Sequence, residues 1–535
     1  MGRESSRLGF LSRVAAATAV VGIGLTLQAS GGVRAQTQSQ RFTISPVTVD
    51  LRQLHSGVAP ARSSAPPFLH AGGLAAMSRA QQVALTQGPT QGVQDVGSPV
   101  PGTGKAAKLK SIGAFQNSGN YTESGGWNPP DGGLIVGQSD IISEFNTAFK
   151  IYDRSGALLA GPTQFYSVMQ ANTGCHSFDF DPTGEYDAVT GHYIMQTPTA
   201  SGNDGSLCLA VSQTSDPTGK WWVYAVPEPV KSDFLDQPRI AIGSDAVYLQ
   251  TDQFLNGSSF IGDLLFAVNK SQLESGANAT VVSQTLTPNY DAVNPVRQLG
   301  TTSDPYVEPG YFISVDNGIC PPTCSNVNIW KWANPFTTNT FTMQGSVTVT
   351  AFNQPVTAQQ KGGSVVTNDA RELAAYLAPD GTIYGAHSIS CNLGGVVDCV
   401  QWYQVGNVDA TPSLVQQGMV GSKGVYRFFP DLAVDKSGDV VMGYTYTSAK
   451  VYPGIDVTGR PAGYKLGTML KEQVEVKGQA FAPGAGQRWG DYAATAIDPT
   501  NSCSAYHLEE YSPNNAGSGN EWAVGYEPWK FTTCS

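Results

Sequence analysis

Arginine and carboxylate side chains recur together at similar places in the chain after Trp127. Only seven arginines lie beyond this point. Five of them begin or just precede a copy of one repeated pattern: Arg239, Arg297, Arg371, Arg427 and Arg488. Carboxylates share these positions: Asp131, Asp236, Glu308, Glu372, Asp431 and Asp491. Guanidinium groups that converge on a concave site bind a carboxylate or phosphate through paired hydrogen bonds. The predicted ligand-binding residues are Arg239, Arg371, Arg427, Arg488 and Asp236. The same residues could instead form partly buried ion pairs between neighbouring repeats.

Two aspartates at equivalent places in adjacent repeats could exchange protons with a bound ligand. Asp431 lies in FPDL and Asp491 in WGDY, each a few residues after the arginine that begins its repeat. If both project into one site, one carboxyl can act as an acid and the other as a base. We predict that they do, although repetition by itself would also place two aspartates at equivalent positions.

Histidine spacing gives little sign of a metal or haem site. The histidines after Trp127 form no H-x-H, H-E-x-x-H or C-x-x-C-H arrangement, so we predict no cofactor. His176 or His387 could act as the base of a lyase, which removes a proton beside a carboxylate neutralised by arginine. The segment DFDPTGEYD from Asp179 resembles part of a calcium loop but lacks the fifth and twelfth ligands of an EF-hand. Calcium therefore stays an open alternative.

One pattern of two short alternating strands around an Asp/Gly turn recurs seven times and must position these side chains. The copies begin at Pro129, His176, Leu235, Tyr306, Ala370, Arg427 and Arg488. Alternation such as Leu432/Val434 marks strands with one buried face, and APDG or DKSG marks hairpin turns. Each copy can supply a small antiparallel sheet, and sheets arranged radially bury one another's faces. The sequence therefore predicts an all-β fold, a seven-bladed β-propeller. Six or eight blades, or a pair of β-sandwiches, are the alternatives.

The start of the chain has the features of a secretory signal peptide. Three arginines precede an apolar run that begins at Val14, and Val33-Arg34-Ala35 resembles a cleavage site. A retained membrane anchor is the alternative, although the run is shorter than the roughly 20 residues that span a bilayer. Residues 36–126 contain no Trp or Cys and are rich in polar and small residues. We predict a signal peptide over residues 1–35, a largely disordered segment over 36–126 and the propeller over 127–535.

Composition limits the class of protein and the partners that it can have. Charged residues make up 14% of the chain, with 60 Gly and 33 Pro, which argues against coiled coils and long helices. Removal of the signal peptide would take away four arginines and one glutamate, shifting the net charge from -11 to -14. An acidic protein without a basic stripe is not expected to bind nucleic acid. We expect a secreted or periplasmic monomer without a transmembrane segment after cleavage.

The cysteines are expected to form disulfides, because an even number of cysteines in an exported chain favours disulfides over zinc. There are eight. Sequential pairing would give four local links, and the near neighbours Cys320/Cys324 and Cys391/Cys399 suggest clips within single hairpins. Connectivity does not follow from the sequence alone.

Several segments resemble exported bacterial β-propeller proteins of the sialidase-like superfamily, which are mostly uncharacterised. The segments are LAVSQTSDPTGKWWVYAVP from Leu209, DQPRIAIGSDAVYLQTDQF, FFPDLAVDKSGDVVMGY and RWGDYAATAIDP. TSDPTGKWW is similar to the Asp-box turn of sialidase blades, with an extra residue between Asp216 and Gly219 and with Trp221 in place of Thr or Ser. In sialidases this box is a structural turn on the outside of the propeller, so the resemblance implies the fold more than an activity.

The resemblance implies a carbohydrate-active enzyme that hydrolyses an anionic glycan. Hydrolysis of a glycosidic bond needs two carboxylates, or in sialidases a tyrosine nucleophile beside a glutamate. Glu509 and Tyr511 in HLEEY project from one face of a strand, which gives a second candidate pair besides Asp431 and Asp491. Strand packing is the simpler explanation of that pair. A non-catalytic propeller that binds a glycan or protein outside the cell, and a uronate polysaccharide lyase, are the alternative functions.

Overall fold

The structure is a computed structural model. It describes residues 38–54, 107–175, 179–201, 204–228, 233–256, 259–287, 290, 292–301, 306–307, 310–315, 323–371, 374–483, 488–517 and 521–535. The predicted signal peptide, residues 1–35, lies outside these ranges, as do His176, Glu308, Cys320 and Glu372. No helix within the described ranges is long and apolar enough to cross a bilayer.

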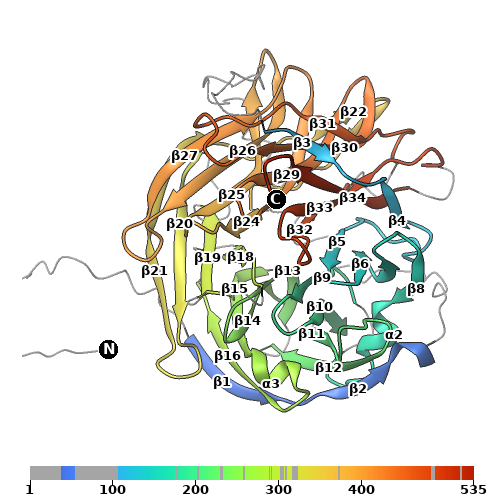
Figure 1. The fold of residues 1–535 in the computed structure, drawn as a ribbon, viewed down its shortest axis with the longest axis vertical. Coiled ribbons are helices and arrows are strands. Elements are labelled where there is room, and N and C mark those ends of the chain that lie inside the picture. Colours follow the sequence, from blue (N-terminus) through green and yellow to red (C-terminus); the bar gives the residue numbers. More distant parts are fainter. Residues whose placement is uncertain are drawn as a thin grey trace, which may run out of the picture. The chain divides into compact units, whose positions relative to one another are not determined.

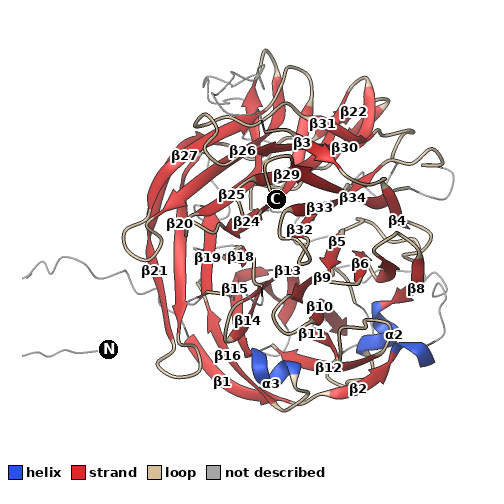
Figure 2. Ribbon diagram, viewed as in Figure 1, coloured by secondary structure: helices blue, strands red, loops and turns tan. Residues whose placement is uncertain are grey.

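In the described part of the chain, seven antiparallel sheets stand side by side as the blades of a β-propeller (Figure 1). Strands make up nearly all of it, with two short helices at the edge of the blades (Figure 2). Within each blade's own repeat, the first strand is innermost and later strands lie progressively further out. Strands β1, β2 and β3, from the N-terminal part of the chain, are added at the outer edges of three sheets. The predicted all-β, seven-bladed fold is confirmed. It follows from alternating strands of about five to ten residues joined by tight turns, each sheet burying its faces against its neighbours.

The first three blades follow one another along residues 133–285. Blade 1 consists of β5 (Gly133–Val136), β6 (Asp140–Phe145), β7 (Ala148–Asp153) and β8 (Leu158–Gln164). Blade 2 consists of β9 (Thr183–Asp187), β10 (His192–Ser201), β11 (Asp204–Ser212) and β12 (Lys220–Pro227). Blade 3 consists of β13 (Asp233–Ile242), β14 (Ala246–Leu255), β15 (Ser259–Asn269) and β16 (Ala279–Thr285). The helix α2 (Phe165–Met169) follows blade 1, and α3 (Lys270–Glu274) joins the last two strands of blade 3.

Blades 4 and 5 depart from this regularity at their inner edges. Blade 4 consists of β17 (Asn294–Pro295), β19 (Gly310–Val315), β20 (Cys324–Ala333) and β21 (Thr340–Phe352). Blade 5 consists of β24 (Ala374–Leu377), β25 (Ile383–Asn392), β26 (Val396–Gly406) and β27 (Ser413–Val420). A short strand β18 (Arg297–Gln298) pairs in parallel with β24, and the hairpin of β22 (Ala358–Gln360) and β23 (Gly363–Val365) connects the two blades. The repeat that we placed at Tyr306 therefore begins on the second strand of blade 4, because the inner strand has only two residues.

The last two blades close the ring with help from the N-terminal part of the chain. Blade 6 consists of β28 (Tyr426–Val434), β29 (Val440–Ser448), β30 (Val451–Arg460) and β31 (Gln473–Val476). Blade 7 consists of β32 (Ala494–Ile497), β33 (Ser504–Tyr511) and β34 (Ala523–Phe531), to which β3 (Leu109–Ser111) and β4 (Gln116–Asn120) add outer strands. The propeller thus joins strands from both ends of the described chain in one sheet.

The described parts of residues 36–126 differ from the largely disordered segment that we predicted. Besides β3 and β4, β1 (Gln38–Ile44) pairs with β16 of blade 3, and β2 (Val47–Asp50) pairs with β12 of blade 2. A one-turn 3-10 helix, Leu51–Gln53, follows β2. These strands cover the outer edges of two blades, where unpaired backbone groups would otherwise be exposed. The polar composition of this segment hid them, because outermost strands contribute little to the core.

Aromatic side chains fill the spaces between blades. Between blades 3 and 4, Trp330, Trp332 and Phe341 pack with Tyr248 and Phe312, and the rings of Trp330 and Phe341 stack with centroids 5.5 Å apart. Both tryptophans are fully buried. Burial of side chains this large contributes a few kcal/mol each, so the blade interfaces hold the ring together.

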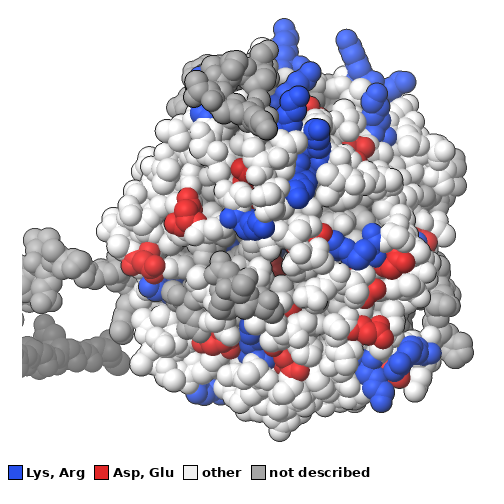
Figure 3. Space-filling view, in the orientation of Figure 1, with Lys and Arg blue, Asp and Glu red and all other residues white. Residues whose placement is uncertain are grey.

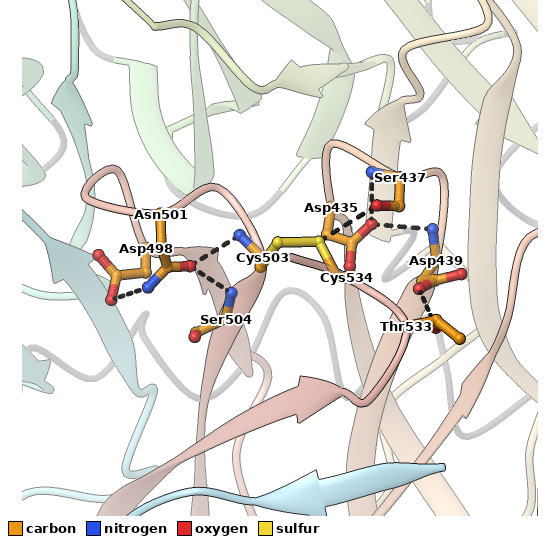
Figure 4. Close-up of a disulfide and its surroundings, with 9 residues drawn as sticks. All are labelled: Asp435, Ser437, Asp439, Asp498, Asn501, Cys503, Ser504, Thr533 and Cys534. Atoms are coloured by element: carbon orange, nitrogen blue, oxygen red, sulfur yellow. Dashed lines mark hydrogen bonds between the residues drawn. A yellow bond between two sulfur atoms is a disulfide. The ribbon is translucent and has the colours of Figure 1, made fainter. Parts of the chain in front are cut away.

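Each of three disulfides joins one cysteine to the next cysteine along the chain. Cys175 pairs with Cys208, Cys391 with Cys399 within the β25–β26 hairpin, and Cys503 with Cys534. Cys324 is also disulfide-bonded. Figure 4 shows that Cys503–Cys534 fastens the chain after β34 to the turn between β32 and β33, beside the blade 6 turn that holds Ser437. The prediction of disulfides is confirmed for these residues.

Candidate functional site

A cavity of about 80 Å³ lies at the starts of the inner strands, at one end of the central channel. Residues of five different blades line it, among them Gly133, Thr183, Arg239, Asp431 and Asp491. The first four hold equivalent places, near the ends of their inner strands, and Asp491 precedes the inner strand of blade 7. A second cavity of about 60 Å³ lies further along the same inner strands. Arg297 lines both cavities. We call the first cavity, with the side chains around it, the channel mouth.

A repeated backbone feature aims these residues at the channel mouth. Two positions before each of Gly133, Thr183, Arg239 and Asp431 stands a residue with φ between 45° and 52°: Asp131, Asp181, Gln237 and Phe429. The last two of these lie in bulges of β13 and β28. A left-handed residue re-aims the strand that follows it. In each of these four blades, the residue two positions after the left-handed residue therefore lines the cavity.

Four aspartates from four blades surround Arg488 at the channel mouth. Asp181 shares side-chain hydrogen bonds with both Asp131 and Asp236, and Arg488 forms an ion pair with Asp491. All four carboxylates act on the guanidinium and raise the pKa of Arg488. We call these five side chains the carboxyl cluster. It brings together blades 1, 2, 3 and 7.

Neutral hydrogen bonds fix the geometry of the carboxyl cluster. Asn146 Nδ2 donates to Asp131 Oδ2 over 2.8 Å, and the backbone N–H of Asp491 donates to Asp131 Oδ1 over 3.0 Å. The Tyr492 hydroxyl donates to Asp181 Oδ2 over 3.1 Å. Asn368 Nδ2, which comes from the connection into blade 5, donates to Asp491 Oδ1 over 2.9 Å. Carboxylates held by several donors keep fixed positions, as acid–base chemistry requires.

Burial and neighbouring charge keep a proton within the carboxyl cluster. Burial raises the pKa of Asp181 well above the usual range of aspartate, and the charges of Asp131, Asp236 and Asp491 raise it further. Burial also raises the pKa of Asp131 well above the usual range and raises that of Asp236, and the hydrogen bonds with Asp181 offset these shifts only in part. Asp131, Asp181 and Asp236 therefore hold protons as a group, with Asp181 at the centre of their hydrogen bonds.

Two buried glutamates lie directly behind the channel mouth. Burial raises the pKa of Glu510 to about 8 and that of Glu144 well above the usual range. A side chain at Gly490 would collide with the Glu510 carboxyl, and one at Gly133 with the Glu144 carboxyl. Glycine at these two positions lets carboxyl groups approach the backbone of the channel mouth from behind.

The structure brings Asp431 and Asp491 to one cavity, but each is already bound to an arginine. Arg297 Nη2 lies 2.6 Å from Asp431 Oδ1, and the Thr495 backbone N–H donates to the other oxygen over 2.5 Å. Arg297 also donates to the carbonyl groups of Thr495 and Leu432. The Arg297–Asp431 pair thus ties blades 5, 6 and 7 together across the channel.

Two of the arginines predicted to bind ligand are buried in ion pairs away from this cavity's lining. Arg371 lies 2.6 Å from Asp369 and 3.0 Å from Asp252. Arg427 is 3% exposed and pairs with Glu472 within blade 6. Repetition placed these arginines near blade starts, but Arg371 reaches Asp252 of blade 3 and Arg427 stays within blade 6, because a buried guanidinium needs a carboxylate partner.

The other two predicted arginines, and Asp236, do belong to the channel mouth. Arg239 lines the cavity, and its guanidinium carbon lies 4.0 Å from the centroid of the Tyr492 ring. Arg488 and Asp236 are members of the carboxyl cluster. The guanidinium of Arg488 is already surrounded by four aspartates of the protein, so it is not available to pair with a carboxylate of a ligand.

Glu509 and Tyr511 lie between blades 6 and 7 and not at the cavity. Glu509 is fully buried, 3.8 Å from His507 Nε2. The Tyr511 ring packs edge-on against Phe115, 5.5 Å between centroids, in a cluster with Ile455. Both residues share one strand face as predicted, but in a propeller both faces of an inner blade strand are buried against neighbouring blades, and this face meets blade 6.

His387 and two aspartates of the possible calcium loop, Asp179 and Asp187, lie elsewhere, whereas the third, Asp181, belongs to the carboxyl cluster. His387 is fully buried between Phe352 and Tyr403, and burial lowers its pKa to about 4. Asp179 accepts a hydrogen bond from Thr197, and Asp187 pairs with Lys270 over 2.8 Å. Within the described ranges no group of three or more His, Cys, Asp or Glu side chains is arranged to hold a metal ion.

Sequence reasoning missed the central member of the carboxyl cluster. Asp181 drew attention only as part of a calcium loop, and Asp131 only as one carboxylate among several. A signal was present: PPDGG and FDPTG place an aspartate directly before Gly or Pro near the start of a repeat, and LDQP places one two residues before Pro. The Asp-box-like turn, by contrast, lies between β11 and β12, where Asp216 accepts from the Thr218 N–H and hydroxyl over 2.9 and 2.6 Å.

Comparisons with known proteins give distant likenesses only. No family model matches the chain, and no curated protein matches its sequence. Among solved structures, a protein of unknown function from Dyadobacter fermentans is 10% identical, with 79% of this chain and 99% of that chain covered at a TM-score of 0.36. An alpha-L-arabinanase from Penicillium chrysogenum is 9% identical, covering 78% and 98% at a TM-score of 0.35. The endosialidase of phage phi92 is 11% identical, covering 79% and 69% at a TM-score of 0.33. These likenesses are too distant to say anything about the activity of this chain.

Proposed function

We propose that this protein is an exported glycoside hydrolase that binds a glycan at the channel mouth. The observation that supports it is the carboxyl cluster, in which Asp181 is hydrogen-bonded to Asp131 and Asp236, and burial raises the pKa values of all three, next to the Asp491 carboxylate. Hydrolysis of a glycosidic bond needs one protonated carboxyl and one carboxylate. The disulfides agree with export, since they persist in oxidising compartments.

In the proposed mechanism, the cluster supplies a proton and Asp491 activates water. Asp236 is only half-buried and lies at the end of the hydrogen-bonded series. It relays a proton, taking the one that Asp181 donates and passing it to the leaving oxygen as the bond to the anomeric carbon breaks. Asp491, which lines the cavity, takes a proton from the water whose oxygen bonds to the anomeric carbon, and this proton then returns to the cluster. Arg488 pairs with Asp491 and holds its carboxylate in place.

The ligand that this geometry favours is a glycan whose sugar units at the mouth are uncharged. The Arg371, Arg427 and Arg488 guanidinium groups are engaged by carboxylates of the protein. Hydroxyl groups can donate to the carboxylates of the site, whereas a carboxylate on the sugar would find the Arg488 guanidinium already paired with Asp491. This differs from the anionic glycan that the arginine spacing predicted.

The test is incubation of the purified protein with neutral and acidic polysaccharides, following new reducing ends and the ultraviolet absorbance of unsaturated uronates. We expect reducing ends from a neutral polysaccharide, without the absorbance. Asp491→Asn and Asp181→Asn should lower the rate by at least about 100-fold. Asp216→Asn, the same substitution in an exposed turn, is the matched control and should retain full activity.

A non-catalytic binding propeller is the second candidate, favoured by the nearly complete burial of Asp131 and Asp181. It predicts no reducing ends from any polysaccharide, together with binding that survives Asp491→Asn. Reducing ends accompanied by the absorbance would indicate a lyase. Either result would overturn the hydrolase proposal.

A further inference from the structure

Five lysines lie close together on the outer edges of blades 6 and 7. They are Lys108 and Lys110 on and beside β3, Lys465 and Lys471 between β30 and β31, and Lys530 on β34. Lys530 is partly exposed and the other four are exposed. Figure 3 shows Lys and Arg side chains gathered in the upper part of the view, where Figure 1 places β3, β30 and β31. We call these five residues, with the exposed Ile112 and Leu466, the lysine patch.

Direct contacts make the patch continuous. Lys110 is the Cα partner of Lys530 in the β3–β34 pairing. The Thr532 N–H donates to the Lys108 carbonyl over 3.0 Å, so this end of β3 stays beside β34. Gln473 Nε2, two residues after Lys471, donates to the carbonyl of Leu109 over 2.9 Å. One surface therefore carries all three segments.

Acidic side chains on the same segments are turned inward. Glu472 pairs with Arg427, Glu475 accepts from the indole N–H of Trp529 over 2.8 Å, and Glu527 accepts from the Ser111 hydroxyl. Within the described residues 107–112, 461–478 and 527–535, no aspartate or glutamate is exposed. The positive charge of the patch is thus not neutralised locally, although the whole chain carries a net charge of -11.

The chemistry of the patch fits a surface of many anions better than a single defined anion. Lysine is a point charge on a flexible stem, whereas arginine has the planar fork that recognises one carboxylate or phosphate. Two aliphatic side chains stand among the lysines: Ile112 is 53% exposed and Leu466 is 64% exposed. Lysines mixed with exposed aliphatic groups are typical of surfaces that lie on anionic lipid, with the apolar groups entering the boundary of the acyl chains.

We propose that the lysine patch docks the propeller on an anionic lipid bilayer. Each lysine near such a surface adds attraction that salt screens, and Leu466 and Ile112 add contact that salt does not screen. The proposal is independent of the function of the channel mouth. It makes the protein a peripheral membrane binder that is held by one side of its ring.

Sedimentation with lipid vesicles tests this proposal. The purified protein is mixed with vesicles of phosphatidylcholine alone, or with 30% phosphatidylglycerol, at low and physiological salt. We expect binding to the anionic vesicles only, and a loss on the order of 100-fold in the triple variant Lys110→Ser, Lys465→Ser, Lys471→Ser. The matched control, Arg41→Ser, Arg52→Ser, Lys220→Ser, removes the same charge from exposed positions on other blades and should bind like the unaltered protein.

A second variant separates lipid from soluble polyanions. Leu466→Ser with Ile112→Ser leaves the charge unchanged and should weaken vesicle binding several-fold while leaving binding to dextran sulfate unaltered. The proposal is overturned if the protein ignores anionic vesicles at low salt, if the control triple variant loses as much binding as the patch variant, or if the apolar pair has no effect.

Discussion

The carboxyl cluster and the lysine patch both concentrate charge of one sign, but they treat it in opposite ways. In the cluster, four aspartates surround the guanidinium of Arg488, and hydrogen bonds from neighbouring side chains hold their carboxyl groups in place. In the patch, five lysines stand exposed or half exposed, and the nearby glutamates are turned inward to other partners. Buried charge must be compensated on the spot, whereas exposed charge need not be.

This difference decides what each region can do. In a medium of low dielectric, fixed carboxyls hold one another's protons and shift their pKa values, so the cluster is suited to proton transfer. Exposed lysines act through the field that they project into solvent, which reaches about 10 Å at 0.1 M salt. The first region is suited to chemistry on one bond, and the second to attraction towards a charged surface.

Removal of the central cation should produce the largest difference between the two regions. Arg488→Met would leave four aspartates facing one another, and we expect it to lower the free energy of unfolding by about 3–5 kcal/mol. Urea denaturation measures this loss. Arg52→Met, which breaks the more exposed pair with Asp50, is the control and should leave the free energy of unfolding nearly unchanged. Equal losses in the two variants would show that the cluster does not depend on its arginine.

Opening of the Cys503–Cys534 disulfide should affect the patch more than the cluster. This bond spans 31 residues and ties the end of the chain, just after Lys530, to blade 7 (Figure 4). We expect the double variant Cys503→Ser, Cys534→Ser to lose about 2–4 kcal/mol of unfolding free energy. Hydrogen exchange should rise first in β3 and β34. If it rises equally in β9 and β13, the blade does not open as a separate unit.

The buried carboxyls make stability depend on pH in a predictable direction. Burial raises the pKa of Glu510 to about 8 and that of Glu274 to about 8. A carboxyl whose pKa is higher in the folded than in the unfolded state stabilises the fold below pH 4, and this stabilisation is lost as pH rises through the folded value. The melting temperature should therefore fall between pH 5 and pH 9.

Glu510→Gln shows how much of that fall comes from behind the channel mouth. The variant should lose on the order of 2 kcal/mol less than the unaltered protein between pH 5 and pH 9, because it has no proton to release there. Asp380→Asn, in an exposed turn, is the control and should follow the unaltered curve. A Glu510→Gln curve parallel to the unaltered one would mean that the pKa of Glu510 is the same in the folded and unfolded states.

Alternation and turn residues were enough to predict seven blades, because each strand repeats the same local physics. Alternation in segments such as LAVD and VVMGY predicted β28 and β29, and the close spacing of Cys391 and Cys399 predicted their disulfide. Blade 4 was placed out of phase, since β17 has only two residues and leaves no periodic signal. The strands β1 to β4 were missed because edge strands are polar.

The candidate site could be predicted only in part, because spacing along the chain does not say which blade supplies a partner. Asp491, Asp236, Arg239 and Arg488 do reach the channel mouth. Arg371 and Arg427 also stand near the starts of their repeats, but Arg371 pairs with Asp252 of blade 3 and Arg427 with Glu472 of its own blade. The role of Asp181 depends on Asp131 and Asp236, which lie about 50 residues away on either side, and only the closed ring brings the three together.

The smallest expected effect tests whether the lysine charges are truly uncompensated. Lys110 and Lys530 are direct cross-strand partners, and like charges at such positions are unfavourable. Lys530→Ser should therefore raise the free energy of unfolding by about 0.2–1 kcal/mol at low salt, and the gain should vanish in 1 M salt, where screening is nearly complete. Lys220→Ser is the matched control, since Lys220 is the cross-strand partner of Asp50, and it should lower stability slightly. If Lys530→Ser lowers stability as Lys220→Ser does, a carboxylate already neutralises the patch and its attraction for anionic lipid is lost as well.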